Sequence, residues 1–303
     1  MKPQFSVGLP NYGPFLPPGD WRRFVDIARS AEDAGVDRII VVDHVVMGNN
    51  TDAYQWGKFP VPPEAPWFEP LTMLTAVAAV TSRIRLATGI LIAPLRPAAL
   101  LAKQAATLDV MSGGRLDLGV GTGWQREEYD AEGLDFERRG QLLTDTIAAC
   151  KVLWRDTPAR FSSPTLSFED IYCEPKPLQP GGVPIWVSGT LHGRNIDRLV
   201  QHGDGWIPIM GETVEGIALG VTQIKDAWKA AGRDPEGLLV RAPLVVARGD
   251  DGKPDIERSM ESVPALVAAG ATDIQATLQA FCREPEGAPE AFKQLVTAFK
   301  RAS

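Results

Sequence analysis

Eight short apolar runs recur along this chain of 303 residues, with segments of helical periodicity between them. Several runs, such as RIIVVD at 38–43 and LVVA at 244–247, are apolar through most of their length, as expected for strands buried on both faces. Alternating strands and helices are typical of parallel βα units, and eight units predict a (β/α)8 TIM barrel. The strands are expected at Phe5–Leu9, Arg38–Asp43, Arg85–Ile92, Arg115–Gly121, Pro184–Ser188, Gly205–Ile209, Val240–Ala247 and Thr272–Thr277.

The helices between these runs have recognisable ends. Asp20 is placed to cap a helix that Gly35 terminates, and Pro97 suits the first turn of another. A stripe at Phe292, Leu295, Val296 and Phe299 predicts an amphipathic final helix. We therefore expect residues 1–303 to form a single barrel domain whose helices cover the sheet.

Two insertions interrupt the repeat, at about 45–67 and 157–182. The first is rich in aromatic residues and prolines and follows the second strand. Because barrel enzymes build their sites at the carboxyl ends of the strands, we favour a lid over the substrate rather than a passive linker. The second insertion predicts a small hairpin with a proline-rich return, and its sequence indicates no function.

Composition excludes several classes of protein. A net charge of -7 without a basic block argues against nucleic acid as the main partner. No apolar run approaches the roughly 18 residues of a membrane span, and the N-terminus lacks a signal-peptide pattern, so we expect a cytoplasmic protein that does not enter a membrane. Three cysteines without paired spacing and only three histidines predict neither disulfides nor a metal site.

The segment SGGRLDLGVGTGW, at 112–124, ends a strand with three glycines within five residues. Glycines can simply relieve crowding where a buried strand turns into a helix. They can also let the backbone approach a ligand closely, and Thr122 and Trp124 would then supply a hydroxyl and a flat wall. The number of glycines and the residues that follow them favour the second interpretation.

Asp43 and His44 end the second strand at the same predicted face of the barrel. An imidazole there can transfer a proton near neutral pH, although a capping carboxylate beside a structural histidine is the plainer alternative. Gly89, inside the third strand beside Thr88, indicates either a bulge near a ligand or a simple packing requirement.

A third feature, Ser188–Thr190, precedes a helix that begins near Gly193. Small residues with free amides at a helix N-terminus can bind phosphate. No nucleophile elbow or Cys–His arrangement appears in the sequence. The pattern therefore favours an enzyme whose difficult chemistry belongs to a flavin-like ring.

These motifs together resemble the bacterial luciferase-like monooxygenase superfamily, and within it the oxidoreductases that depend on the deazaflavin coenzyme F420. The resemblance covers nearly the whole chain and is carried by SVGLPNYG, EDAGVDRIIVVDH, RLATGILIAPLRPAALLAKQAATLDVMSGGRLDLGVGTGW, VPIWVSGT and GDGWIP. It implies a (β/α)8 barrel with insertions, F420 or FMN bound at the carboxyl ends of the strands, and a homodimer.

The resemblance also assigns roles to residues. It makes His44 the catalytic acid or base, gives Thr88–Ile90 a bulge that often holds a non-proline cis peptide behind the ring, and directs Gly121–Trp124, Tyr129 and Ser188–Thr190 to the ribityl chain and phosphate. Asn11, Asp43 and His44 would border the ring. The full set expected to contact the cofactor is Asn11, Asp43, His44, Thr88, Gly89, Ile90, Gly121, Thr122, Gly123, Trp124, Tyr129, Ser188, Gly189 and Thr190.

One difference from the family pattern limits the class of substrate that we expect. Sugar-phosphate dehydrogenases of this superfamily carry a glutamate directly after the GTG triplet, whereas this chain has Trp124. The leading hypothesis is an F420-dependent oxidoreductase that transfers a hydride between the deazaflavin C5 and a small apolar or aromatic substrate. An FMN-dependent two-component monooxygenase and a catalytically silent flavin-binding barrel are the alternatives.

Overall fold

The computed structural model describes residues 2–16 and 19–303. Its main sheet is parallel and closes on itself, because β3 pairs with both β2 and β5. The order around the barrel is β3, β2, β1, β11, β10, β9, β8, β5 and β4, and the predicted (β/α)8 barrel is confirmed when β3 and β4 are counted as halves of one strand. The strands are β1 (Gln4–Gly8), β2 (Arg38–Val41), β3 (Arg85–Thr88), β4 (Leu91–Ile92), β5 (Leu116–Gly121), β8 (Ile185–Ser188), β9 (Gly205–Ile207), β10 (Leu239–Pro243) and β11 (Asp273–Thr277).

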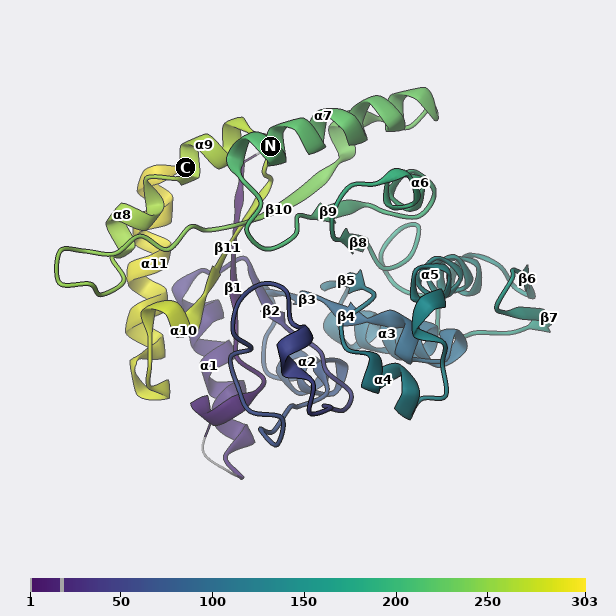
Figure 1. Ribbon diagram of the computed structural model, residues 1–303, viewed down its shortest axis with the longest axis horizontal. Helices are drawn as coiled ribbons and strands as arrows, with labels where there is room; N and C mark the ends of the chain where they lie inside the picture. The colour runs from purple at the N-terminus through teal and green to yellow at the C-terminus, as the bar shows by residue number, and fades with distance from the viewer. Residues whose placement is uncertain (1, 17–18) are drawn as a thin grey trace.

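The helices surround this sheet on its outer face (Figure 1). Gly35 ends α1 in the left-handed conformation, as predicted, while Asp20 makes no side-chain capping bond and instead pairs with Arg23. The helices are α1 (Trp21–Ala34), α2 (Pro70–Ala78), α3 (Ala98–Ser112), α4 (Arg126–Ala131), α5 (Arg139–Arg155), α6 (Gly193–Gln201), α7 (Val214–Ala230), α8 (Ile256–Met260), α9 (Val263–Ala268), α10 (Leu278–Phe281) and α11 (Ala288–Ala302). Short 3-10 turns are η1 (Gly13–Phe15), η2 (Thr51–Ala53), η3 (Ala93–Leu95), η4 (Phe136–Arg138), η5 (Pro235–Gly237) and η6 (Pro285–Gly287).

The third strand is divided, although the sequence predicts one strand from Arg85 to Ile92. The peptide bond between Gly89 and Ile90 is cis and separates β3 from β4. β3 pairs with both of its neighbours, whereas β4 pairs with β5 alone. The cis peptide that the family resemblance implies for this bulge is therefore present.

Two other strands end earlier than the sequence predicts. β2 ends at Val41 because the backbone N–H and C=O groups of Val42 both bond to the side-chain amide of Asn11. β10 ends at Pro243, which has no N–H to donate to a neighbouring strand. Val245 beyond it is well exposed, so its apolar character does not mark a buried strand.

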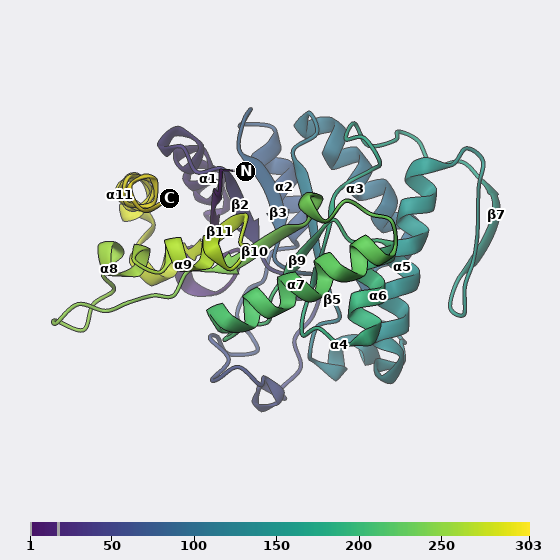
Figure 2. The ribbon, with the colours of Figure 1, turned by 90° about the horizontal axis from the view of Figure 1, so that it is seen from above.

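The two insertions project from different sides of the barrel (Figure 2). Residues 45–67 form an irregular segment, dark blue in Figure 2, that contains η2. Residues 157–182 contain the predicted hairpin, formed by the antiparallel strands β6 (Ala159–Ser162) and β7 (Ser167–Ile171), which extends away from the barrel in Figure 2. No helix in the described part of the chain is both long and apolar enough to cross a membrane.

The interior of the barrel contains ion pairs as well as apolar side chains. Arg38 bonds to Asp117 through Nε at 2.8 Å and to Asp273 through Nη1 at 2.6 Å, and all three side chains are buried. Burial would raise the pKa of Asp117, but the guanidinium groups of Arg38 and Arg85 lower it to about 2. These pairs join β2 to β5 and β11, which each lie two places from β2 around the barrel, and so hold non-adjacent strands together.

Candidate functional site

The carboxyl ends of the strands form an accessible mouth above a buried interior. Gly8, Ser188, Ile207 and Gln275 are partly exposed there, whereas residues two positions earlier on the same strands are buried. Alternate residues of a strand point to the same side, so exposure on this side begins at or near the last residue of each strand. This is the end of the barrel where (β/α)8 enzymes carry their sites.

His44 lies at this mouth and is held by a carboxylate from α4. Its Nδ1 is 3.0 Å from Oε2 of Glu128, and the other carboxylate oxygen accepts the backbone N–H of Val45 at 2.9 Å. The Glu128 side chain is 0% exposed, so water does not compete for these bonds. With an ionised Glu128 the proton resides on Nδ1, and Nε2 of His44 is left to exchange a proton with a ligand.

Aromatic rings enclose His44 on several sides. Phe59, Trp67 and Trp124 meet the imidazole edge-on, with ring centroids at 5.7, 4.6 and 5.8 Å. Tyr54 packs against Phe59 and Trp124. We call Tyr54, Phe59, Trp67 and Trp124 the aromatic wall. Burial raises the pKa of Tyr54, so its hydroxyl keeps its proton at neutral pH.

Both ends of the 45–67 segment are bonded to the barrel. At one end the Gln125 side chain bonds to both backbone groups of Gly48, at 2.9 and 3.2 Å. At the other, Trp67 stacks on Tyr12 with ring centroids 4.3 Å apart. The hydroxyl of Tyr54 lies 3.6 Å from Sδ of Met210, beyond β9. The segment thus crosses the mouth beside His44.

Asp43 and Asn11, for which contact with a ring is predicted, are both buried and engaged in the protein itself. Asp43 pairs with Arg96 at 2.7 Å and accepts the backbone N–H of Ile92 at 2.8 Å. The Asn11 side chain connects Val42 to Phe68. In this arrangement both residues hold the loops on either side of His44 in place.

The glycines of GVGTG make room for the third strand. A Cβ at Gly119 would lie 2.1 Å from the carbonyl oxygen of Thr88, which no side chain tolerates. At Gly121 and Gly123 a Cβ would come within 3.1 Å of Ile90 and 3.0 Å of Ile92, respectively. The Thr88 hydroxyl also donates to the carbonyl of Gly119 at 2.7 Å. Packing between the third and fourth strands therefore explains why all three positions are glycine. A contact of these residues with a cofactor stays a prediction.

Tyr129 supports the turn that follows this strand. Its hydroxyl donates to the carbonyl of Thr122 at 2.5 Å, and its ring is buried against Phe136. Burial raises the pKa of the Tyr129 hydroxyl, which remains protonated. The predicted contact of Tyr129 with a ribityl chain or phosphate remains untested.

Ser188, Gly189 and Thr190 form a loop before α6 that suits an anion. Gly189 adopts φ +116°, which favours glycine, and the Asn195 side chain donates to the carbonyl of Thr190 at 3.1 Å. The first turn of α6 carries no acidic residue. Arg198 lies buried behind Asn195 and bonds to neutral acceptors, and its pKa is lowered by burial and by Arg194.

These features fit a cofactor that joins a flat ring to a phosphate. The N-terminus of α6, whose first turn has no acidic residue, suits the phosphate. The aromatic wall and the Thr88–Ile90 bulge present apolar surface at the mouth. In residues 2–16 and 19–303, no cluster of three His, Cys, Asp or Glu side chains is arranged to hold a metal ion.

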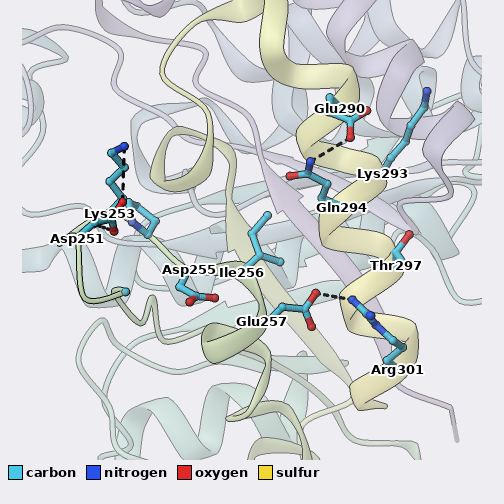
Figure 3. Close-up of a pocket in the computed structure, with 12 residues that line it drawn as sticks. Asp251, Lys253, Asp255, Ile256, Glu257, Glu290, Lys293, Gln294, Thr297 and Arg301 are labelled. Atoms are coloured by element: carbon cyan, nitrogen blue, oxygen red, sulfur yellow. Dashed lines mark hydrogen bonds and ion pairs between the residues drawn. The ribbon is translucent and has the colours of Figure 1, made fainter.

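Two cavities lie away from this mouth. One of about 640 Å³ separates residues 249–257 from the outer face of α11 (Figure 3), where Glu257 pairs with Arg301 and Gln294 bonds to Glu290. A second, of about 400 Å³, lies at the amino end of the barrel near Asp204 and Trp228. None of the residues expected to contact a cofactor lines either one.

Glu128 is the main functional candidate that sequence reasoning missed. It belongs to a pair of adjacent glutamates in the first turn of α4. The sequence does not reveal which of the two points inward. Its position four residues after Trp124 provides the only signal, since that spacing puts it one helical turn beyond the end of the glycine-rich strand.

Comparison with known proteins adds relatives of two kinds. An uncharacterized protein of Mycobacterium tuberculosis is 36% identical over 212 residues, which span 66% of this chain and 73% of that protein. A phthiodiolone/phenolphthiodiolone dimycocerosates ketoreductase of the same species is 29% identical over 206 residues, covering 67% of this chain and 53% of that enzyme.

Solved structures share the fold at low identity. An F420-dependent secondary alcohol dehydrogenase, in complex with an F420–acetone adduct, has a TM-score of 0.78 and 17% identity, with 99% of each chain covered. The monooxygenase RslO1 from Streptomyces bottropensis has a TM-score of 0.74 and 19% identity, covering 98% of this chain and 99% of that one. The family model of luciferase-like monooxygenases matches residues 5–284. The chain therefore belongs to the luciferase-like monooxygenase family.

Proposed function

We propose that this protein is an F420-dependent oxidoreductase that transfers a hydride between the deazaflavin C5 and a small apolar or aromatic alcohol or ketone. The observation that carries this proposal is the His44–Glu128 pair beside the aromatic wall. It supplies one proton-transfer group among aromatic side chains, and an alcohol–ketone interconversion needs one proton besides the hydride.

His44 transfers that proton. In the oxidative direction Nε2 accepts the hydroxyl proton of the substrate while the carbinol hydrogen leaves with its electron pair as hydride. In the reductive direction the same nitrogen returns the proton to the new alkoxide oxygen. Glu128 keeps the imidazole oriented and balances the charge that His44 gains, because its carboxylate is fixed by the Val45 N–H.

The cofactor supplies a carbon that accepts or donates hydride. Ser188–Thr190, the start of α6 and Arg194 would hold its phosphate, and the region of Thr88–Ile90, His44 and Trp124 would border its ring. The 45–67 segment would exclude water from the reacting atoms.

The aromatic wall supports a neutral, flat or apolar substrate. Phe59 and Trp124 present hydrocarbon surface. Trp124 also stands where the sugar-phosphate enzymes have glutamate, so this wall offers a sugar phosphate no such polar group. The likeness to an F420-dependent alcohol dehydrogenase and the relation to a ketoreductase favour carbonyl chemistry.

Cofactor binding is the direct test. We expect micromolar affinity for F420 by fluorescence quenching or calorimetry and much weaker binding of FMN, followed by absorbance changes with secondary alcohols or ketones. The reverse preference, with oxygen consumption in the presence of reduced FMN, would instead identify a monooxygenase. Binding without turnover across alcohols, ketones, enones and aldehydes would identify a silent barrel.

The role of Glu128 has its own test. A Glu128→Gln variant keeps the shape of the side chain but removes its charge, so we expect kcat to fall about 10- to 100-fold while cofactor affinity changes little. The pH profile of kcat should shift as well. Glu132→Gln, at the exposed end of α4, is the control and should leave that profile unchanged.

Dimeric assembly also belongs to this proposal. The family resemblance implies a homodimer, and sedimentation equilibrium of the purified protein at micromolar concentration measures its mass directly. A monomer under these conditions would remove the dimer from the proposal without affecting the chemistry at His44.

A further inference from the structure

Arg198, in α6, is a buried arginine whose hydrogen-bond partners are all neutral. It is 5% exposed. Within residues 2–16 and 19–303 its Nε donates to Oγ1 of Thr144 at 3.0 Å, its Nη1 to Oδ1 of Asn195 at 2.6 Å and its Nη2 to the carbonyl of Gly140 at 2.9 Å. Burial and then the charge of Arg194 lower its pKa, but an arginine stays protonated in proteins. A buried positive charge is therefore left without a carboxylate.

This charge lies toward the N-terminus of α6. The Arg198 side chain extends back along the helix to Asn195, three residues earlier. Its partner on α5, Gly140, belongs to the first turn of that helix. Helix N-termini carry a positive partial charge, so both helices disfavour a cation at this place. Asp197, the one acidic residue of α6, is exposed. These surroundings favour the binding of an anion.

A second arginine, at the other end of α6, shows the contrast. Nη1 of Arg233 donates to the carbonyls of Leu199 and Val200, both at 2.8 Å, and Nη2 donates to the carbonyl of Gly203 at 2.9 Å. The C-terminus of a helix carries a negative partial charge, which stabilises a cation. The helix end itself thus stabilises Arg233, whereas Arg198 lies at the end that does not.

One side chain separates Arg198 from the Ser188–Thr190 loop. The Asn195 amide donates to the first and third carbonyls of this loop, at 3.4 and 3.1 Å, and Nε1 of Trp206 donates to the second at 3.0 Å. All three carbonyls are thus turned toward the protein. In the described part of the chain, the backbone N–H groups of residues 190–194 have no backbone acceptor. The loop therefore offers donors to an anion, with the Arg198 charge behind them.

We propose that Arg198 supplies the charge by which the Ser188–Thr190 loop selects a cofactor that carries a phosphate over the same ring system without one. This inference rests on the proposed function, in which the cofactor phosphate binds at the start of α6. Arg198 is a positioning residue that acts through Asn195 and touches neither the phosphate nor the reacting atoms. A buried charge still attracts an anion several ångströms away, because little solvent screens it.

A purely structural role for Arg198 makes a different prediction. If Arg198 only joins α6 to α5, its loss would weaken the binding of both kinds of ligand by the same factor. If it attracts the phosphate, only the ligand with a phosphate loses affinity. The ratio of the two dissociation constants distinguishes these roles even when the variant is less stable.

The first experiment compares F420 with its phosphate-free ribityl-deazaflavin, and FMN with riboflavin, by fluorescence quenching. For Arg198→Met we expect the phosphate-bearing ligand to lose about tenfold in affinity and the phosphate-free ligand to bind as in the wild type. Arg233→Met is the matched control. It removes a half-buried arginine from the opposite end of α6 and should leave the ratio of the two affinities unchanged. An equal loss for both ligands in Arg198→Met overturns the inference.

Thr144→Asp tests the same charge without removing the arginine, and decides the question if Arg198→Met does not fold. It places a carboxylate where Nε of Arg198 now meets a hydroxyl. The compensated arginine should attract phosphate less, so the preference for the phosphate-bearing ligand should fall about tenfold while the melting temperature does not fall. Thr144→Asn, which is neutral and of the same shape as the aspartate, should keep the wild-type preference. A folded Thr144→Asp variant that keeps it too overturns the inference.

Inorganic phosphate separates this inference from the proposed function. A wild-type protein that binds neither F420 nor FMN contradicts the proposed function, whatever the variants do. Phosphate should still raise the melting temperature of the wild type above that measured in sodium chloride of equal ionic strength, because a ligand stabilises the fold that binds it. The increase should be smaller for Arg198→Met. The same increase in both proteins, or none in the wild type, overturns the inference.

Discussion

The interior of the barrel and its mouth both contain buried charges, but they arrange them differently. In the interior, Arg38 bonds to two aspartates, one from each of the strands that lie two places to either side of its own. At the mouth, the one charged partner of His44 among residues 2–16 and 19–303 is Glu128, and aromatic rings lie around the rest of the imidazole.

From this difference we expect the interior ion pairs to contribute mainly to the stability of the fold, and the His44–Glu128 pair mainly to catalysis. Removing one member of the interior network leaves a buried charge without compensation, which destabilises the whole fold. Removing His44 takes one hydrogen bond from the buried Glu128 carboxylate but leaves the bond from the Val45 N–H, so the fold should lose less stability while proton transfer is lost. Four predictions test this division, from the largest expected effect to the smallest.

His44→Ala should break the chemistry alone. We expect kcat to fall about 10²- to 10⁴-fold, the usual contribution of a general acid or base. The cofactor should still bind, and the melting temperature should move by only a few degrees. Turnover assays and thermal unfolding measure the two effects. Full turnover in a variant that binds cofactor would remove His44 from the mechanism.

Asp117→Asn should break the fold instead. The substitution leaves Arg38 and Arg85 without the carboxylate that both of them contact. We expect the free energy of unfolding in urea to fall by about 3–5 kcal/mol, the usual cost of breaking a buried pair. Asp251→Asn, on an exposed turn, is the control and should change it by less than about 0.5 kcal/mol. If Asp117→Asn lowered the unfolding free energy as little as Asp251→Asn does, the interior ion pairs would not be what stabilises the fold.

Lowering the pH should reduce the unfolding free energy of the wild-type protein through the same carboxylate, that of Asp117. The pKa of Asp117 is lowered to about 2 in the folded chain, from an ordinary value of 3.8. A lowered carboxyl pKa stabilises the fold above the unfolded value, so about 2 kcal/mol is present above pH 4 and is lost as the pH falls through 2. Unfolding free energies measured from pH 5 to 2 should show this slope. If Asp117→Asn retains the full wild-type slope, other carboxylates account for it.

Tyr54→Phe should have the smallest effect. It removes the hydroxyl that lies 3.6 Å from Sδ of Met210 and keeps the ring in the aromatic wall. We expect KM to rise about twofold, with kcat and the unfolding free energy nearly unchanged, because a hydrogen bond to sulfur is weak. Steady-state kinetics measure it. A large fall in kcat would mean that this hydroxyl contacts the substrate.

Much of the fold can be predicted from the sequence, because buried strands and helix ends depend on nearby residues, such as apolar runs and the helix-ending Gly35. The break in the third strand is less readable, since a glycine inside a strand is compatible with either a bulge or simple packing. At the site, the placement of His44 at the mouth agrees with the sequence. The engagement of Asp43 by Arg96 does not follow from the sequence, because the two residues are 53 positions apart and meet only when the barrel closes.

Close contact between Thr88 and Gly119 restricts how this barrel can be recombined. The Thr88 carbonyl, Ile90 and Ile92 of the third strand fill the space that side chains would need at Gly119, Gly121 and Gly123 of the fourth strand. Each strand is therefore a poor partner for a strand taken from an ordinary barrel. A chimera joined between α3 and β5 should misfold, whereas one joined beyond Trp124 transfers both strands together and retains their fit.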